Sequence, residues 1–565
     1  MDILLLMLLP FLGYILMYRF YGKFLSQKIF NISSENIAPS VKLEDGIDYV
    51  PTKKEIIFGH HYTSIAGTGP IVGPAIAIIW GWVPAIIWIF VGSVVMGAVH
   101  DFGSLVISMR NDGKSISEYT SKYLNNRTKL LFFAIVFLEL WIVIAIFGLV
   151  IAIIFKIYPS SVFPVWFQIP IAMTLGFLVY KKGKNITKWS IFALIAMYAT
   201  VILGYYLKVE MPTILGVPPT GVWTIILLIY AFIASVLPVT ILLQPRDYIN
   251  AYQLIVAMTL LILGVFGAVF LKDMTIVAPA FDYSPKDAPP LLPFLFITIA
   301  CGAISGFHSL VSSGTSSKQV INERDALFVG YGSMLMEGVL AILVLIAVAG
   351  GIGLGLHGLE GSAAWQQHYE SWNAAKGLGS KIGAFVIGSS NMISTLGIPQ
   401  FIATTIMGVF VASFASTTLD SATRIQRYIV TELFVGLKIN IFKNRFVATA
   451  FVVITAAILA FVNGADGKGA LNLWPLFGAI NQTLAALALI IITLYLKTKG
   501  KGKWIYTGIP AIFMTVVTIW ATIENQIDFI NKNQIFLAVV NAIVVVIVIW
   551  IAIEGLIKFF SIDTE

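Results

Sequence analysis

The chain contains repeated apolar stretches, each long enough to cross a lipid bilayer. A membrane-spanning helix needs about 20 mostly apolar residues. Because lipid offers no partners for backbone N–H and C=O groups, such stretches fold as helices. The pattern predicts an all-α polytopic membrane protein with about fifteen transmembrane helices. The predicted spans are residues 3–18, 57–80, 84–108, 129–155, 162–180, 189–207, 222–243, 251–271, 291–315, 326–350, 399–420, 446–463, 471–496, 504–523 and 534–557.

Composition excludes an ordinary soluble protein, because 58% of the residues are hydrophobic and 11% are charged. The net charge of +8 does not indicate a nucleic-acid partner, since Lys and Arg gather between the apolar spans. The single cysteine, Cys301, excludes a disulfide within the chain. With the basic connections in the cytoplasm, the spans alternate without conflict, the N-terminus outside and the C-terminus inside. These connections are residues 110–129, 181–188, 424–445 and 497–503.

The ends and one long connection define the predicted organisation. Positive charges follow the first apolar span, whereas a signal peptide carries them before it, so a retained helix is predicted. Residues 351–398 are too polar to cross, and 383–397 within them are short and rich in Ser and Gly, which predicts an outer lid or re-entrant piece. The predicted parts are 1–30, an N-terminal peripheral helix; 55–350, the first repeat, inserted helices and start of the second repeat; 351–398, the outer loop; 399–500, the rest of the second repeat; and 501–565, C-terminal peripheral helices.

Two apolar spans are poorly suited to an uninterrupted helix. Residues 58–74 and 299–318 contain Gly or Pro, which weaken or interrupt the backbone ladder. Secondary transporters use such breaks to hold anionic substrates and cations. Because the two spans run in opposite directions, they predict an inverted repeat. The weakening residues are Gly67, Gly69, Pro70, Gly73 and Pro74 in the first span and Gly302, Gly306 and Gly314 in the second.

Ionisable side chains at membrane depth are costly and are therefore functional candidates. His60 and His61 precede the first break, where they either carry a coupling proton or bond to carbonyl groups near the inner mouth. A zinc site there is disfavoured, because adjacent side chains diverge by about 100° on a helix and no Cys accompanies them. No metal site is therefore predicted. Glu139 and Glu337, near mid-span, are further candidate proton carriers.

His100 and Asp101 stand near the inner end of the span 84–108. A carboxylate at this depth needs a partner, and Arg110 is the nearest basic residue along the chain. We therefore expect a structural role for both residues, with Asp101 held in an ion pair by a basic neighbour such as Arg110.

The end of the span 399–420 groups two hydroxyls and a carboxylate. Thr417, Thr418 and Asp420 offer the oxygen ligands that a hard cation such as sodium prefers. The alternative is that the hydroxyls bond the preceding helical turn and that Asp420 caps the helix or pairs with Arg424. The upstream broken helix favours the cation site.

Several motifs carry a family resemblance. The most specific is Phe58–Ala75, and the others are Gly97–Phe102, Arg110–Ser115, Leu242–Asn250, Ser312–Lys318 and Ala415–Arg427. Together they resemble the carbon starvation protein A family of bacterial and archaeal inner-membrane transporters, over about residues 1–500. The resemblance implies ion-coupled uptake of peptides or pyruvate under nutrient limitation.

The resemblance also implies a LeuT-like core, as in the amino acid–polyamine–organocation superfamily. This core has two inverted five-helix repeats, in which the first and sixth helices are unwound around the substrate. A pair of Ser/Thr hydroxyls on the eighth helix holds sodium with carbonyls of the first. The spans 57–80, 291–315 and 399–420 would be these three helices, with two extra helices inserted in the first half.

The prediction is a secondary active importer of small carboxylate-bearing nutrients, with the lipid bilayer and a small molecule as its partners. No enzymatic activity, cofactor or nucleic-acid partner is expected. Pyruvate or peptide as substrate, proton or sodium as coupling ion and the oligomeric state stay open; a channel, or a transporter of another small organic acid or amino acid, is the alternative. Ion coupling is assigned to His60, His61, Glu139, Thr417, Thr418 and Asp420. Substrate binding is assigned to Thr63, Ser64, Ala66, Gly67, Thr68, Gly69, Pro70, Ser305, Gly306, His308 and Ser309.

Overall fold

A computed structural model describes residues 2–500 and 502–562, and this part of the chain is helical, with isolated bridges but no β-strand. Twelve segments of the described chain are long and apolar enough to cross a membrane. The all-α prediction is confirmed. The helices of these segments are α1 (Asp2–Met17), α5 (Trp82–Val91) with α6 (Ala98–Met109), α8 (Asn126–Ile157), α9 (Val162–Gly176), α10 (Ile186–Tyr206), α11 (Pro219–Val236), α12 (Leu243–Lys272), α15 (Gly332–Ala349), α19 (Gln400–Gly436), α21 (Trp474–Lys497), α22 (Ile505–Asn531) and α23 (Ile535–Ser561).

The remaining predicted spans are shorter or broken helices. A thirteenth crossing results if the bent pair α3 (Lys54–Ile65) and α4 (Gly69–Ala77) is one span. The predicted span 291–315 is divided into α13 (Leu291–Thr298) and α14 (Gly306–Gly314), and α20 (Arg445–Phe461) has only 17 residues. Helix length thus supports twelve or thirteen crossings in the described chain, and the count of fifteen stays a prediction.

Short elements extend or connect these helices. Asparagine caps the N-terminal end of α8, α10 and α20, because the side chains of Asn125, Asn185 and Asn444 accept hydrogen bonds from free N–H groups of the first turn. The short α-helices are α2 (Pro39–Lys42), α7 (Ile116–Tyr123), α16 (Gly361–His368), α17 (Trp372–Ala375) and α18 (Leu378–Ser394). The π-helical segments are η1 (Tyr18–Gly22), η2 (Leu25–Ile29), η4 (Gly92–Gly97), η6 (Phe177–Lys181) and η9 (Leu327–Tyr331). The 3-10 turns are η3 (Ile78–Trp80), η5 (Pro159–Ser161), η7 (Ser316–Lys318), η8 (Glu323–Asp325), η10 (Gly351–Leu354), η11 (Asn440–Lys443) and η12 (Lys468–Leu473).

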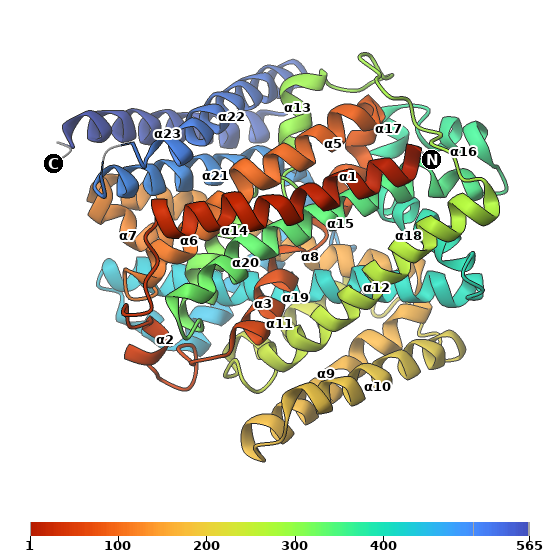
Figure 1. The fold of residues 1–565 in the computed structure, drawn as a ribbon, viewed down its shortest axis with the longest axis horizontal. Helices are drawn as coiled ribbons and strands as arrows, with labels where there is room; N and C mark the ends of the chain where they lie inside the picture. The colour runs from red at the N-terminus through yellow and green to blue at the C-terminus, as the bar shows by residue number, and fades with distance from the viewer. Residues whose placement is uncertain (1, 501, 563–565) are drawn as a thin grey trace.

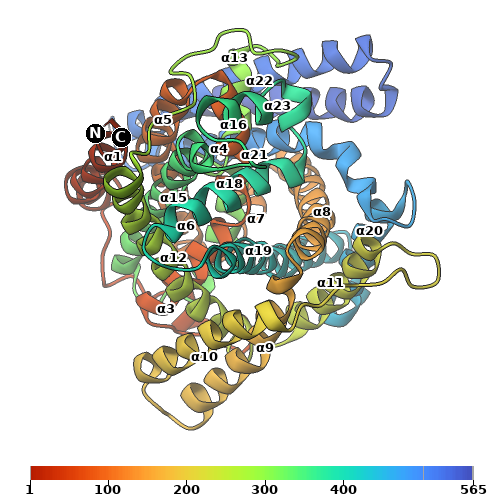
Figure 2. The same ribbon diagram turned by 90° about the vertical axis from the view of Figure 1, so that its right-hand side faces the viewer.

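The long helices run roughly along the long axis of the molecule, and the two termini lie at opposite ends of it (Figure 1). Seen along this axis, the α9–α10 hairpin lies at one edge of the bundle, and α22 with α23 lies at the opposite edge (Figure 2). Burial separates centre from periphery: 94% of the apolar window of the α21 span is buried, against 28% for α10. The broken helices therefore lie among the buried helices.

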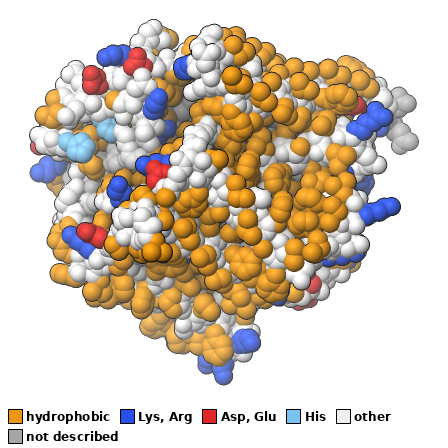
Figure 3. Space-filling view, turned by 180° about the vertical axis from the view of Figure 1, so that it is seen from behind, with side chains coloured by type: hydrophobic (Ala, Val, Ile, Leu, Met, Phe, Trp, Pro, Cys, Tyr) orange, Lys and Arg blue, Asp and Glu red, His pale blue; other side chains and the backbone are white. Residues whose placement is uncertain are grey.

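The surface fits a bilayer. A broad apolar belt covers the middle of the molecule, and charged side chains gather toward its two ends (Figure 3). Exposed apolar side chains of the membrane-spanning helices include Leu9, Phe177, Ile195 and Ile512. Such a belt is stable only in contact with lipid.

The outer connection is more ordered than a loop. The segment predicted as a short lid or re-entrant piece forms most of α18, a 17-residue helix. Its buried face packs against α12, α15 and α19, and Asn391 donates hydrogen bonds to the carbonyls of Gly351 and Gly355. This packing makes α18 part of the bundle.

Candidate substrate and ion site

Both predicted helix breaks are present. The backbone leaves the helix for three residues between Ile65 and Gly69, and the chain bends by 44° there. The second break extends over residues 299–305, between α13 and α14. The first break falls within the predicted stretch Ala66–Pro70, because Gly67, Gly69 and Pro70 concentrate the helix-breaking residues there.

Two glycines allow the breaks to approach their neighbours closely. A Cβ atom on Gly67 would lie 2.3 Å from Thr418 Oγ1 of α19, and one on Gly69 would lie 2.3 Å from Cys301 Sγ of the second break. Real Cβ atoms essentially never come this close to other heavy atoms, so a larger residue at either position would force a neighbouring group to shift. The two breaks and α19 therefore meet at one place, as the LeuT-like arrangement requires.

One face of α19 contacts the first broken helix. Thr418 Oγ1 donates to the Ser64 carbonyl at 3.2 Å, and the Ser64 and Ser421 hydroxyls are 2.8 Å apart. Thr418 and Ser421 are three residues apart and so share this face. Thr63, also assigned to substrate binding, instead donates to the Gly59 carbonyl of its own helix at 2.8 Å.

A second face of α19 contacts α12 instead. Asn250 donates to Thr417 Oγ1 at 2.9 Å, and Arg246 forms a buried ion pair with Asp420. Tyr230 also donates to Asp420, at 2.9 Å. Of the predicted cation ligands, Thr418 thus faces a carbonyl of the first broken helix, whereas Asp420 pairs with arginine. Thr417 donates to the Ser413 carbonyl of the preceding turn at 3.1 Å, as the alternative predicts.

The alternative pairing of Asp420 with Arg424 is wrong. Arg424 Nη1 lies 2.9 Å from Asp48 Oδ1 in the connection before α3, and Arg427 reaches the same oxygen at 3.1 Å. Partial burial alone would raise the pKa of Asp48, but Arg427, Arg424 and Lys318 together lower it from 3.8 to about 2. This cluster ties the N-terminal connection to α19.

The two adjacent histidines diverge, as their position on one helix predicts. His60 lies with Nδ1 2.7 Å from Asp247 Oδ2 and Nε2 3.1 Å from Thr315 Oγ1. His61 Nδ1 lies 2.8 Å from Ser316 Oγ. Both histidines thus bond to side chains, whereas the alternative predicted bonds to carbonyl groups. The bonds to Thr315 and Ser316 join α3 to the end of the second broken helix.

Asp101 is held by histidines and not by Arg110, so that expected ion pair is wrong. Asp101 Oδ1 lies 2.8 Å from His100 Nδ1, and Asp101 Oδ2 lies 3.0 Å from His308 Nδ1. The other nitrogen of His308, Nε2, lies 3.3 Å from Glu337 Oε2, without the geometry of a hydrogen bond. His308, assigned to substrate binding, is thus the centre of a buried ionisable cluster.

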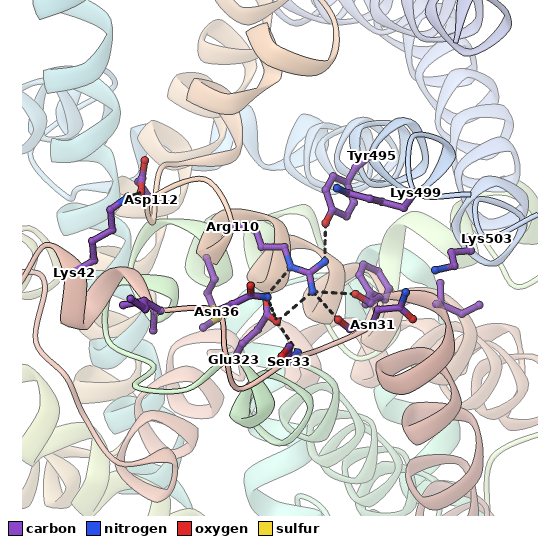
Figure 4. A pocket seen from close by; sticks show the side chains of 15 residues that line it. Asn31, Ser33, Asn36, Lys42, Arg110, Asp112, Glu323, Tyr495, Lys499 and Lys503 are labelled. Carbon is purple, nitrogen blue, oxygen red and sulfur yellow. Dashed lines mark hydrogen bonds and ion pairs between the residues drawn. The ribbon is translucent and has the colours of Figure 1, made fainter. Parts of the chain in front are cut away.

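Arg110 lies in a pocket of about 630 Å³ that no residue of either break lines (Figure 4). Its Nε is 2.6 Å from Glu323 Oε1, and its Nη1 donates to the Tyr495 hydroxyl at 2.6 Å. Lys499 and Lys503 also line this pocket. Arg110 therefore joins the end of α6 to η8 and α21. It does not form the ion pair with Asp101 that its position in the sequence predicts.

Two asparagines missed by the sequence reasoning support the site. Asn481 Oδ1 accepts from the Phe307 N–H at 3.0 Å and from the Ser305 hydroxyl at 3.1 Å, so it satisfies the start of α14. Ser309 donates to the Gly306 carbonyl within that turn. Asn481 and Asn250 are buried amides in apolar spans, and that isolation is the signal that could have identified them.

Glu139 is buried in the middle of α8, as predicted. Neither carboxyl oxygen has a hydrogen-bond partner among the described residues. None of the residues assigned to substrate binding is exposed, so the centre is closed in this structure. All of them are buried except Gly69, which is half-buried: Thr63, Ser64, Ala66, Gly67, Thr68, Pro70, Ser305, Gly306, His308 and Ser309.

A bilayer-sized bundle in which two interrupted helices meet against one long helix defines a secondary transporter of LeuT-like fold. A solved mutant of a manganese transporter from Eremococcus coleocola has this overall fold, with a TM-score of 0.51 at 12% identity, over 92% of this chain and 99% of that one. This likeness concerns the fold alone.

The chain belongs to the carbon starvation protein CstA family, whose sequence model matches residues 2–521. It is 34% identical over 580 residues to the peptide transporter CstA of Campylobacter jejuni, covering 93% of this chain and 80% of that protein. It is 31% identical over 575 residues to the pyruvate/proton symporter BtsT of Escherichia coli, covering 90% and 79%. The chain is a transporter and not an enzyme.

Proposed function

We propose that the protein imports pyruvate or short peptides through the cytoplasmic membrane by ion-coupled alternating access, with its N-terminus outside. Relatives named as a peptide transporter and as a pyruvate/proton symporter support these substrate classes. Both classes carry a carboxylate, which a helix N-terminus stabilises. The basic connections between spans support the orientation.

The observation that carries the proposal is the set of free backbone donors at the two breaks. Within the described chain, the N–H groups of Gly67, Thr68, Gly302 and Ser305 have no hydrogen-bond partner. All four residues are buried, where an unpaired N–H costs about 1–3 kcal/mol. A substrate carboxylate or water at the breaks would satisfy such groups, and this favours substrate binding there.

We further propose that the coupling ion is a proton, carried by Glu139. Three observations support the proton over sodium. Asn250 bonds to Thr417 and Arg246 pairs with Asp420, so Thr418, which donates to the Ser64 carbonyl, is the one member of the predicted sodium set that faces the first broken helix. Glu139 is a buried carboxyl without a partner among the described residues, so its neutral form is tolerated and its charge is costly. One relative is named a proton symporter.

The test is uptake of labelled pyruvate and of a labelled dipeptide into proteoliposomes, with an inward proton or an inward sodium gradient imposed separately. Accumulation above the external concentration with the proton gradient alone is expected. Accumulation that requires sodium would contradict the proton proposal, and equilibration without accumulation would indicate a channel.

The Glu139→Gln variant tests the carrier. It keeps the shape of the side chain but cannot exchange a proton, so proton-driven accumulation should fall to equilibration. The matched control is Glu524→Gln on the peripheral α22, which should accumulate substrate like the parent protein. Full accumulation of substrate by Glu139→Gln would show that a group other than Glu139 carries the coupling proton.

A further inference from the structure

The second break brings a thiol, an imidazole and a carboxylate together. Cys301 lies in the break itself, His308 in the first turn of α14 and Glu337 in α15. All three residues are buried, and one ligand atom from each lies within 4.8 Å of the others. Sequence reasoning did not connect them, because Cys301 and His308 lie in the second broken span and Glu337 lies in another helix.

The polar atoms in this cluster lack protein partners. His308 Nε2 and both oxygens of Glu337 are buried without a hydrogen bond among the described residues. A neutral His308 that donates from Nδ1 to Asp101, 3.0 Å away, carries its lone pair on Nε2, which faces Glu337. A carboxylate behind a ligating histidine is the usual second layer of a metal site.

We propose that Cys301, His308 and Glu337 form a binding site for a thiophilic divalent cation such as Zn²⁺ or Cd²⁺. Thiolate sulfur, imidazole nitrogen and carboxylate oxygen are the ligands such ions take, and three protein ligands leave the fourth position open. Ligand atoms in a tetrahedral zinc site are about 3.5 Å apart, so side-chain adjustment of about 1 Å completes the site. Binding releases the thiol proton to solvent and forms the metal–sulfur bond.

The place of the site gives the ion an effect on transport, and this part rests on the proposed function. Cys301 contacts the first break at Gly69, and Glu337 belongs to α15, which packs against α4. An ion bound by all three side chains ties the second broken helix to α15 in the closed conformation. Since alternating access requires these helices to move, the bound ion blocks uptake.

Cadmium binding to the purified full-length protein tests the site. Cys301 is the only cysteine in the 565 residues, so the ultraviolet absorption of a cadmium–thiolate bond reports on this site alone. One equivalent of Cd²⁺ should produce the band, and Zn²⁺ should remove it by competition. Cys301→Ser should abolish the band, while His308→Gln and Glu337→Gln should weaken binding at least tenfold.

Two controls separate the site from a lone thiol and from misfolding. His368→Gln, a histidine of the outer helix α16, should bind Cd²⁺ like the parent protein. Equal affinity of the parent, His308→Gln and Glu337→Gln proteins would overturn the proposal. In the unsubstituted protein, Zn²⁺ should also protect Cys301 from alkylation by N-ethylmaleimide, and unchanged alkylation would overturn it without any variant.

The effect on transport has its own readout. In proteoliposomes, Cd²⁺ should inhibit substrate uptake by the parent protein, and the ratio of uptake with and without Cd²⁺ should return to one in Cys301→Ser. If Cd²⁺ binds but does not inhibit uptake, the proposed block of transport is wrong, and the proposed metal site still holds. Absence of any uptake would contradict the proposed function, whereas the binding experiment decides the metal site on its own.

Discussion

At the scale of single residues, Asp48 shows how a polar connection is attached to the membrane core. Its side chain is 18% exposed and contacts Arg424 and Arg427 of α19. Both arginines are themselves buried, so their charges need this carboxylate. The connection before the first broken helix is thereby fixed to the helix that the break contacts.

The lowered pKa of Asp48 predicts acid sensitivity. Because the pKa falls from 3.8 to about 2 on folding, the cluster stabilises the native state fully above about pH 4 and loses this contribution as the pH falls toward 2. The shift corresponds to about 2 kcal/mol. Thermal unfolding in detergent should show that Asp48→Asn lowers stability at pH 6 but converges with the parent near pH 2. Asp528→Asn, in an exposed pair with Lys532, should change little at either pH.

Because Arg246 and Asp420 form a buried ion pair, we expect a substitution of Asp420 to change the stability of the protein and not the ion dependence of transport. Asp420→Asn leaves the buried Arg246 paired with Asp247 alone, at 3.1 Å, so it should destabilise the protein, by less than the about 3–5 kcal/mol of a fully unpaired buried charge. The double variant Arg246→Met with Asp420→Leu should regain much of this loss in the same thermal unfolding assay. Parent-like unfolding of Asp420→Asn together with loss of a sodium dependence that the parent protein shows would instead make Asp420 a cation ligand.

At the scale of elements, the close contact between the first break and α19 is the most sensitive packing in the site. Gly67→Ala places a Cβ atom 2.3 Å from Thr418 Oγ1, so one of the two elements must shift. Overpacking of this kind costs about 1–3 kcal/mol. We expect loss of proton-driven uptake in proteoliposomes with the protein still folded.

The control for this prediction is a glycine with room around it. A Cβ atom on Gly148 of α8 would lie 3.7 Å from its nearest neighbour, which is an ordinary contact. Gly148→Ala should therefore transport like the parent protein. Equal uptake by both variants would show that the break does not need this close approach.

The breaks were predictable from sequence, whereas the contacts of α19 were not. Gly67, Gly69 and Pro70 act on their own backbone, so their effect is visible in a local window. Which neighbouring helix each side chain of α19 faces depends on partners that are distant in the sequence. Thr417 and Thr418 are adjacent in the chain, yet one bonds to α12 and the other to α3.

The buried ionisable cluster shows the same limit. Asp101 and His308 were each recognised as candidates, but they are separated by 207 residues in the chain. Sequence proximity favoured Arg110 as the partner of Asp101, and the fold places Arg110 against Glu323 instead. Pairing between distant elements is a property of the packed bundle and has no local signature.

At the scale of the whole molecule, the charge pattern predicts the orientation in the membrane. The two ends of the described chain lie at opposite ends of the long axis (Figure 1), which fits the prediction of one terminus on each side of the bilayer. The connection between α9 and α10 is exposed and contains Lys181, Lys182, Lys184 and Lys188. Basic connections stay in the cytoplasm, which predicts that α17, whose Asn373 is exposed, lies on the other side.

Cysteine labelling of intact cells checks this orientation. In a Cys301→Ser chain, single cysteines replace Lys184 and Asn373, both of which are exposed. A membrane-impermeant maleimide should label Asn373→Cys in intact cells and Lys184→Cys only after the cells are broken open. The two variants control each other for expression and reactivity, since both must react in broken cells. The reverse labelling pattern would mean that the protein has the opposite orientation in the membrane. The direction of transport that is inferred from the imposed gradients would then be reversed as well.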